Sequence, residues 1–243
     1  MYPIDLWFVL SCYIVPEQVQ TFALICQGAN TVVNTKKFWM RLYWCHCVNP
    51  WSLPDRLQPD RIESRPGLKN RIIRALFHCY EPLKYRVLAN TAQNESLDHL
   101  QFMNCSSIWF KQMILKKQTK VWAFYFKFAK KSDREQHRLR YLSKEWFDKA
   151  DFINANPELD YFVLQVNCMN FLLVPPSAIG QILTSIFINL SQSMRHNCVK
   201  MIFHNFRSNR KYKPSNGLTV TLDPVFDYRV MQWWHPLYPH HSD

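Results

Sequence analysis

The hydrophobic and polar positions of residues 2–44 follow the spacing of short helices. Helices are expected after Pro3 and after Pro16, because proline is tolerated in a first helical turn. The apolar face of the first helix holds Leu6, Leu10, Tyr13 and Ile14. The stripe of the second holds Val19, Phe22, Ala23 and Cys26, and a third helix is expected at about residues 31–44. Helices this short cannot bury so much apolar surface among themselves, so part of it should contact a partner or the rest of the chain.

Farther along, the pattern predicts one more helix and then strands. A connector at residues 51–66, rich in proline and charge, precedes a helical pattern at 67–80. Alternating aromatics then share one strand face: Trp122, Phe124, Phe126 and Phe128. Strands are expected at residues 108–115, 121–128, 161–174, 179–190, 198–206, 218–222 and 225–231. Strands without intervening helices favour an antiparallel β-sandwich.

We therefore expect an α+β chain in three parts. Residues 1–48 form a three-helix module, residues 49–104 a helical connector, and residues 105–239 the β-sandwich.

Residues 161–194 carry no charged side chain, which raises the alternative of a membrane span. The stretch contains several amides, and Pro175-Pro176 breaks its middle. Amides and a double proline are costly in one lipid-exposed helix, so two adjacent buried strands explain the alternation better. Membrane attachment remains the alternative.

The net charge of +12 indicates an acidic partner. Lysine and arginine gather at residues 111–140 and 207–213, where they would suit an acidic or phosphorylated peptide, RNA or anionic lipid, unless these loops only carry solvated charge. The candidate substrate-binding residues are Lys116, Lys117, Lys120, Arg207, Arg210, Lys211 and Trp234. Trp234 belongs to a tryptophan pair that either packs the two parts together or contributes to a binding patch. Binding of nucleic acid is not favoured, because the aromatic strand face is expected to be core.

No motif supports catalysis or a cofactor. Glycine is scarce, at four residues, and neither a phosphate-binding loop nor a nucleophile elbow occurs. Cys45, Cys47, His78 and Cys79 suggest a zinc site only weakly, because Cys-x-Cys is poor ligand spacing. The eight cysteines follow no secretory signal, so we expect reduced thiols and a cytoplasmic or nuclear protein. The chain is accordingly expected to be neither an enzyme nor a metal protein.

The start of the chain resembles an F-box. The resemblance is carried by Pro3, Asp5, Leu6, Leu10, Ile14, Pro16, Val19, Ile25, Cys26, Phe38, Trp39 and Leu42. Tyr2 and Ala29 depart from it, because they stand where leucine and tryptophan are usual. The resemblance implies that a Skp adaptor is bound by Pro3, Leu6, Leu10, Ile14, Pro16, Val19, Phe38, Trp39 and Leu42. The alternative is an ordinary helical element docked on its own domain.

Nearly the whole chain is similar to the transmembrane protein 183 family. The strings that carry this similarity include Phe38-Trp39-x-Arg41-Leu42-Tyr43, Trp122-x-Phe124-x-Phe126-Lys127-Phe128, Leu222-Asp223-Pro224 and Trp233-Trp234-His235-Pro236. Despite its name, that family carries an F-box-like region and is placed with ubiquitin-ligase receptors. The resemblance implies a substrate receptor that joins a Skp adaptor and a cullin scaffold. A membrane-associated protein without ligase function and a basic nucleic-acid-binding module are the alternatives.

Overall fold

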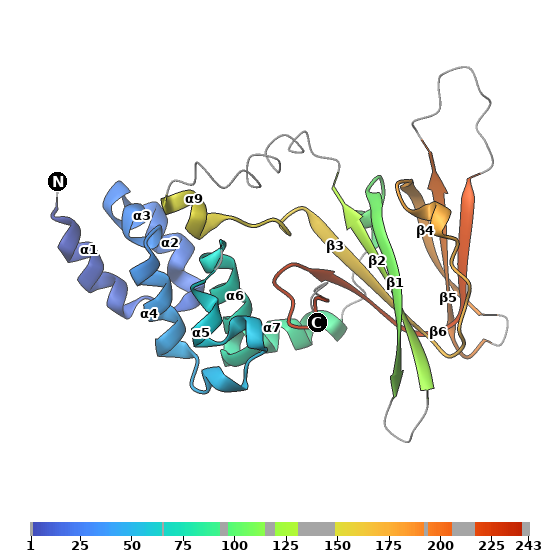
Figure 1. Cartoon of the computed structure of the whole chain (residues 1–243), viewed down its shortest axis with the longest axis horizontal. Coiled ribbons are helices and arrows are strands. Elements are labelled where there is room, and N and C mark those ends of the chain that lie inside the picture. The colour runs from blue at the N-terminus through green and yellow to red at the C-terminus, as the bar shows by residue number, and fades with distance from the viewer. Residues whose placement is uncertain are drawn as a thin grey trace, which may run out of the picture. The chain divides into compact units, whose positions relative to one another are not determined.

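The computed structural model describes residues 2–64, 66–92, 97–114, 120–130, 149–191, 194–205 and 217–239. The chain divides into two compact units. The helical unit contains the described residues of 2–89, 149–157 and 234–236, and the β unit contains the remaining described residues. Figure 1 shows helices at the start of the chain and strands after them, which confirms the α+β class.

The α-helices are short and follow closely on one another. They are α1 (Ile4–Leu10), α2 (Val19–Ile25), α3 (Gln27–Val33), α4 (Lys36–His46), α5 (Pro59–Ile62), α6 (Leu68–Cys79), α7 (Glu81–Ala92) and α9 (Lys149–Asn154). Single 3₁₀ turns are η1 (Ser11–Tyr13), η2 (Pro16–Gln18), η3 (Pro50–Ser52), η4 (Asp55–Leu57), η5 (Leu97–Leu100) and η6 (Pro176–Ala178).

The third expected helix, at residues 31–44, is two helices in the structure. Thr35 has extended backbone angles, and its side-chain hydroxyl accepts a hydrogen bond from the Phe38 amide, which caps α4. Cys26 is also extended and caps α3, because its sulfur accepts a hydrogen bond from the Ala29 amide. The prediction of one helix was therefore wrong, because a capping threonine outweighed the continuous apolar pattern.

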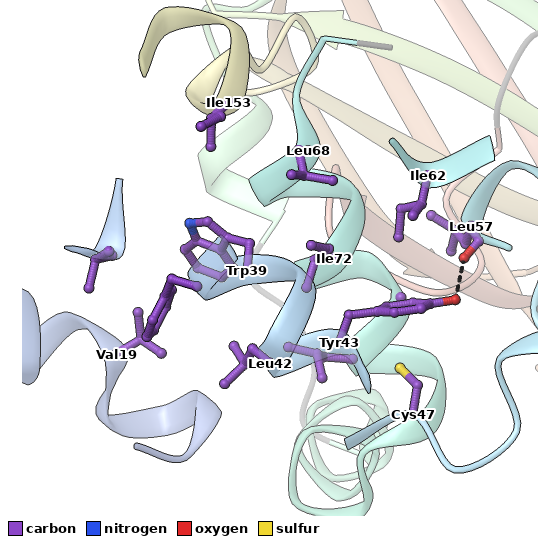
Figure 2. Close-up of a cluster of buried hydrophobic side chains, with 14 of the residues drawn as sticks. Val19, Trp39, Leu42, Tyr43, Cys47, Leu57, Ile62, Leu68, Ile72 and Ile153 are labelled. Atoms are coloured by element: carbon purple, nitrogen blue, oxygen red, sulfur yellow. Dashed lines mark hydrogen bonds between the residues drawn. The ribbon is translucent and has the colours of Figure 1, made fainter. Parts of the chain in front are cut away.

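The helical unit has one core, made mainly by α2, α3, α4 and α6 (Figure 2). Its fully or nearly fully buried side chains include Phe22, Val32, Trp39, Leu42, Tyr43, Leu57, Ile62, Ile72 and Leu76. The Tyr43 hydroxyl donates a 2.9 Å hydrogen bond to the Leu57 carbonyl (Figure 2). A segment distant in sequence completes this core, because Ile153 of α9 joins it. There Gly67, with φ of 86°, approaches the Ala155 carbonyl so closely that a Cβ would lie 2.5 Å from that oxygen.

The β unit contains six antiparallel strands: β1 (Asn104–Ile114), β2 (Lys120–Ala129), β3 (Tyr161–Cys168), β4 (Ile182–Leu190), β5 (Asn197–His204) and β6 (Leu218–Gln232). Their order is β1-β2-β3-β6-β5-β4, and β4 returns to β1 through Asn104 and Ile182. Flanking hydrogen bonds from Phe102 and Cys105 to the carbonyls of Leu183 and Gln181 extend this seam. The sheet therefore closes on itself, and the expected sandwich of two separate sheets is not what the structure contains.

The expected alternation along the aromatic strand, β2, is confirmed. Phe124, Phe126 and Phe128 are fully buried in the core enclosed by the sheet, together with Leu164, Val166 and Phe203. The two strands expected at 218–222 and 225–231 form the single strand β6, which continues through the cis Asp223–Pro224 peptide. The uncharged stretch that raised the question of a membrane span supplies β3 and β4. Among the described residues, no helix combines the length and the apolar character needed to cross a membrane.

Candidate functional site

The outer face of α1 is an exposed apolar ridge. Leu6, Val9 and Leu10 are 42%, 59% and 41% exposed, and Tyr13 of η1 continues the same face at 79%. We call these four residues the α1 ridge. No residue of α1 is buried. Three large apolar side chains on one side of α1, continued by Tyr13 of η1, leave a surface that favours contact with another apolar surface.

The inner face of α1 holds the ridge in place. Trp7 packs against Phe22, with 6.2 Å between ring centroids, and lies directly over Gly28. The Lys37 ammonium lies 5.6 Å from the centre of the Phe8 ring. At the end of the ridge, the Arg41 guanidinium donates a hydrogen bond to the Cys12 carbonyl. α1 therefore docks through its inner side chains onto α2, α3 and α4, and the ridge residues face outward.

A hollow lies beside the C-terminal end of the ridge. It is lined by Ser11, Cys12, Ile14, Phe38, Arg41, Leu42, Cys45 and His46. Burial lowers the pKa of the His46 imidazole, and this effect is opposed by the carboxylate of Glu17, which accepts a 3.1 Å hydrogen bond from the Tyr80 hydroxyl. Because His46 is then mainly neutral at neutral pH, the positive charge in the lining of the hollow comes from the Arg41 guanidinium.

Replacing Gly28 by Ala is expected to loosen α1. An added Cβ would lie 2.7 Å from Cδ1 of Trp7, and the indole would have to move, which typically costs about 1–3 kcal/mol. We expect the amide protons of residues 6–12 to exchange with solvent at least about tenfold faster, measured by hydrogen-exchange mass spectrometry. Thr31→Ala, at an exposed position of the same helix, is the control. Unchanged exchange in Gly28→Ala would show that Trp7 does not hold α1.

The nine residues expected to contact an adaptor divide into two groups. Pro3, Leu6 and Leu10 are exposed, and Ile14 and Pro16 are half-buried. Val19, Phe38, Trp39 and Leu42 are at most 8% exposed and belong to the helical core, as Figure 2 shows for Val19, Trp39 and Leu42. The side chains of the second group therefore belong to the core that supports the ridge, and in this conformation they are not available for contact with a partner. Val9 belongs to the ridge but was missed, although its place one helical turn after Leu6 could have shown it.

The candidate substrate-binding residues of the two basic stretches are mostly outside the described residues. This holds for Lys116, Lys117, Arg207, Arg210 and Lys211. Lys120 is exposed at the start of β2. Trp234 stacks on Phe77 of α6, with 4.6 Å between ring centroids and 25° between ring planes. Its ring is therefore partly used in packing within the helical unit.

An exposed aromatic cluster of the β unit was not foreseen. The rings of Phe110, Trp122 and Phe171 lie 4.9–5.9 Å apart, and we call them the Phe110 cluster. Phe110 is 54% exposed and Phe171 is 46% exposed. Phe171 was expected inside a long strand at 161–174, but β3 ends at Cys168. Phe110 pairs with Phe124 across β1 and β2, which places both side chains on one face of the sheet. Recognising this pairing in the sequence would have placed Phe110 beside the aromatic strand face.

Of the cysteines considered as zinc ligands, Cys47 and Cys79 are in contact and Cys45 lies apart from them. The sulfur atoms of Cys47 and Cys79 lie 2.6 Å apart, whereas Cys45 is exposed. Within the described part of the chain, no group of three or more histidine, cysteine or acidic residues could hold a metal ion.

The sequence is similar to known proteins over nearly its whole length. It is 37% identical to Transmembrane protein 183 of Mus musculus and 38% identical to Transmembrane protein 183A of Homo sapiens, over 241 residues in each case. The matched region covers 98% of this chain and 64% of each relative, so the chain spans slightly less than two thirds of their length. No solved structure matches it.

The β unit also matches a family model. The model is described as the transmembrane protein 183 C-terminal domain, and it covers residues 102–231, from just before β1 to the last residue but one of β6. Together with the similarity to these relatives, this match shows that the chain belongs to the transmembrane protein 183 family.

Proposed function

We propose that the chain is a substrate receptor of a Skp–cullin–F-box ubiquitin ligase. The observation that carries the proposal is the α1 ridge, an apolar surface displayed by a helical unit that has a complete core of its own. The F-box resemblance of the same residues supports the choice of a Skp adaptor as the partner. The receptor itself performs no chemistry, and the cullin scaffold is joined through the adaptor.

The spacing of the ridge suits a groove-binding helix. Leu6, Val9, Leu10 and Tyr13 stand at positions i, i+3, i+4 and i+7, the spacing with which amphipathic helices fill apolar grooves. Complete burial of a leucine or valine side chain contributes about 1.5–3 kcal/mol, so part-exposed side chains in this number can support a stable complex.

The β unit would hold the substrate. Binding the substrate and the ligase to one chain raises the effective concentration of the substrate near the ubiquitin-loaded enzyme. The Phe110 cluster supplies aromatic anchors of the kind that concentrate binding energy, and the exposed Lys120 belongs to the same hairpin. The net charge of +12 favours an acidic or phosphorylated substrate.

The function is tested by mixing the purified full chain with purified Skp adaptor and measuring binding by calorimetry. We expect a one-to-one complex with a negative heat-capacity change, because apolar surface is buried on binding. Absence of a complex at micromolar concentrations would refute the receptor proposal. A reconstituted cullin complex should then retain the chain only when the adaptor is present.

Phe171→Asp is expected to impair substrate capture without affecting the adaptor. The substitution removes the Phe171 ring from its contacts with Phe110 and Trp122 and places a carboxylate beside them, so we expect recovery of cross-linked substrate to fall at least about tenfold. Quantitative mass spectrometry of proteins cross-linked to the full chain in cells measures this. Phe187→Asp is the matched control, because Phe187 of β4 is 48% exposed, as Phe171 is 46% exposed. Equal losses in both variants would remove the Phe110 cluster from the proposal.

A second candidate function is membrane association. The relatives are named transmembrane proteins, and an exposed apolar ridge on a chain with a net charge of +12 is suited to an anionic membrane surface. Flotation with vesicles containing phosphatidylserine separates the two candidates. Binding of the chain to vesicles that is lost in Leu6→Asp, without adaptor binding, would favour the membrane. Adaptor binding without flotation would favour the receptor and an intracellular location in the cytoplasm or nucleus.

A further inference from the structure

Two cysteines that are distant in sequence meet at one end of the helical core. Cys47 directly follows α4 and is 3% exposed, and Cys79 is the last residue of α6. Their sulfur atoms are 2.6 Å apart, compared with about 2.0 Å in a disulfide. Figure 2 shows Cys47 at the edge of the buried cluster, near Tyr43. A small movement of the two side chains would bring the sulfur atoms to the length of a disulfide bond.

The two thiols differ in reactivity. The two thiols share a hydrogen bond in which either sulfur could be the donor, and this contact lowers the pKa of Cys79 and raises that of Cys47. The Lys84 ammonium also lowers the pKa of Cys79. Cys79 is half-buried and Cys47 is buried, so Cys79 is the more accessible thiol and also the one that ionises more readily.

The other cysteines lack this combination. Cys105 and Cys168 are fully buried in the β unit, where burial raises the pKa of each thiol to about 12. Cys12 and Cys45 are exposed but have no second thiol against them in the structure, in which all eight cysteines are described. Cys47 and Cys79 are therefore the pair of thiols already placed to form a disulfide when peroxide is present.

We propose that Cys47 and Cys79 are a redox modification site, at which peroxide converts the two thiols into a reversible disulfide that links the end of α4 to the end of α6. This inference does not depend on the proposed ligase function. In intracellular proteins such disulfides are usually transient and respond to oxidants.

The reaction has two steps. The Cys79 thiolate attacks one oxygen of hydrogen peroxide, forming an S–O bond and breaking the O–O bond, and the departing hydroxide takes up a proton to become water. The sulfur of Cys47 then attacks the Cys79 sulfenic acid, forming the S–S bond and breaking the S–O bond. The second hydroxide leaves as water with the proton of Cys47. The two thiols together lose two electrons and two protons, and the peroxide is reduced to two water molecules. A small-molecule thiol reverses the reaction by disulfide exchange.

The link would stiffen the support of the α1 ridge. The closed loop contains η3, η4, α5 and α6, and a cross-link restricts the unfolded chain more when it closes a longer loop. α4 also carries Lys37 and Arg41, which contact Phe8 and the Cys12 carbonyl of the ridge region. Oxidation should therefore raise the melting temperature of the helical unit and slow the amide exchange of α1.

The test uses the reduced full chain, treated with hydrogen peroxide and then with an alkylating reagent, followed by peptide mass spectrometry. We expect a linked peptide pair containing Cys47 and Cys79, formed at least about ten times faster than any other cysteine modification and reversed by dithiothreitol. The wild-type chain alone gives this answer, so the test does not depend on folding of a variant. If both thiols of the peroxide-treated chain are alkylated as rapidly as those of the untreated chain, the proposal is overturned.

Variants identify the roles of the two thiols. In Cys47→Ser, the sulfenic acid of Cys79 should accumulate and be trapped by dimedone, whereas Cys79→Ser should react at least about tenfold more slowly at position 47. Cys45→Ser is the control and should form the disulfide at the wild-type rate. Titration of the reduced chain with zinc provides a further check. Stoichiometric binding of zinc that needs both thiols and prevents oxidation would assign the pair to a metal site and overturn the disulfide proposal.

Discussion

The double variant Leu6→Asp, Leu10→Asp is expected to lose the proposed binding to the Skp adaptor while the chain stays folded. Each substitution removes an apolar side chain that contributes about 1.5–3 kcal/mol when fully buried, and each places a carboxylate in an apolar groove without a partner. Because about 1.4 kcal/mol corresponds to a tenfold change in affinity, the combined loss should exceed about a thousandfold. Calorimetric titration with the adaptor measures it, and circular dichroism follows the fold.

The fold should be nearly insensitive to this change, since both side chains are more than 40% exposed in the free chain. Substitutions at such positions usually alter the free energy of unfolding by less than about 0.5 kcal/mol. Leu24→Asp, Val48→Asp is the matched control. It introduces two carboxylates at residues that are 78% and 95% exposed in the same unit but lie outside the ridge. Loss of adaptor binding in this control as well would mean that net charge, and not the ridge, decides the affinity.

The helical spacing of the first residues was sufficient to predict the outward face of α1. Leu6 and Leu10 are four residues apart, about one helical turn, and both are exposed in the structure. The same spacing could not separate contact residues from supporting residues, because Trp39 also lies on an apolar stripe but is buried beneath other helices. A periodic pattern identifies the apolar side of a helix, whereas the partner of that side depends on the tertiary arrangement.

The β unit shows a similar division. Alternation along β2 correctly placed Phe124, Phe126 and Phe128 in a core. An inward-facing strand has the same pattern in a sandwich and in a closed sheet, so the alternation could not distinguish them. The distinction depends on the seam between Asn104 and Ile182, and the irregular residues before β1 gave no signal for it.

Contacts between distant segments were the least predictable part of the candidate sites. Cys47 and Cys79 were both considered as metal ligands, but nothing in their own segments indicates that the ends of α4 and α6 meet. Phe171 was likewise assigned to a strand, because its apolar neighbours hide the point at which β3 ends. Such pairings depend on the packing of complete helices and strands, which local patterns do not specify.

Trp39→Ala is expected to destabilise the helical unit by about 3–5 kcal/mol, the usual cost of truncating a buried aromatic side chain. Trp39 is 3% exposed, its ring meets Phe38 edge-on at 5.5 Å, and the Lys69 ammonium lies 5.6 Å from the ring centre. Proteins of this size have a total stability of about 5–15 kcal/mol, so the loss is a large fraction of it. Thermal unfolding should show a melting temperature lower by more than about 10 °C. Leu24→Ala, at a residue that is 78% exposed, should unfold like the wild type.

The same variant separates a supporting role of Trp39 from direct contact with the adaptor. If Trp39 only supports the ridge, adaptor binding by Trp39→Ala should decline with the folded fraction and recover when the sample is cooled below its transition. Leu6→Asp, Leu10→Asp should behave in the opposite way, with an unchanged melting temperature and no binding at any temperature. Loss of adaptor binding by a fully folded Trp39→Ala chain would contradict this assignment. It would mean that the helical unit opens when the adaptor binds and presents Trp39, now buried beside Phe38 and Leu42, as part of the contact surface.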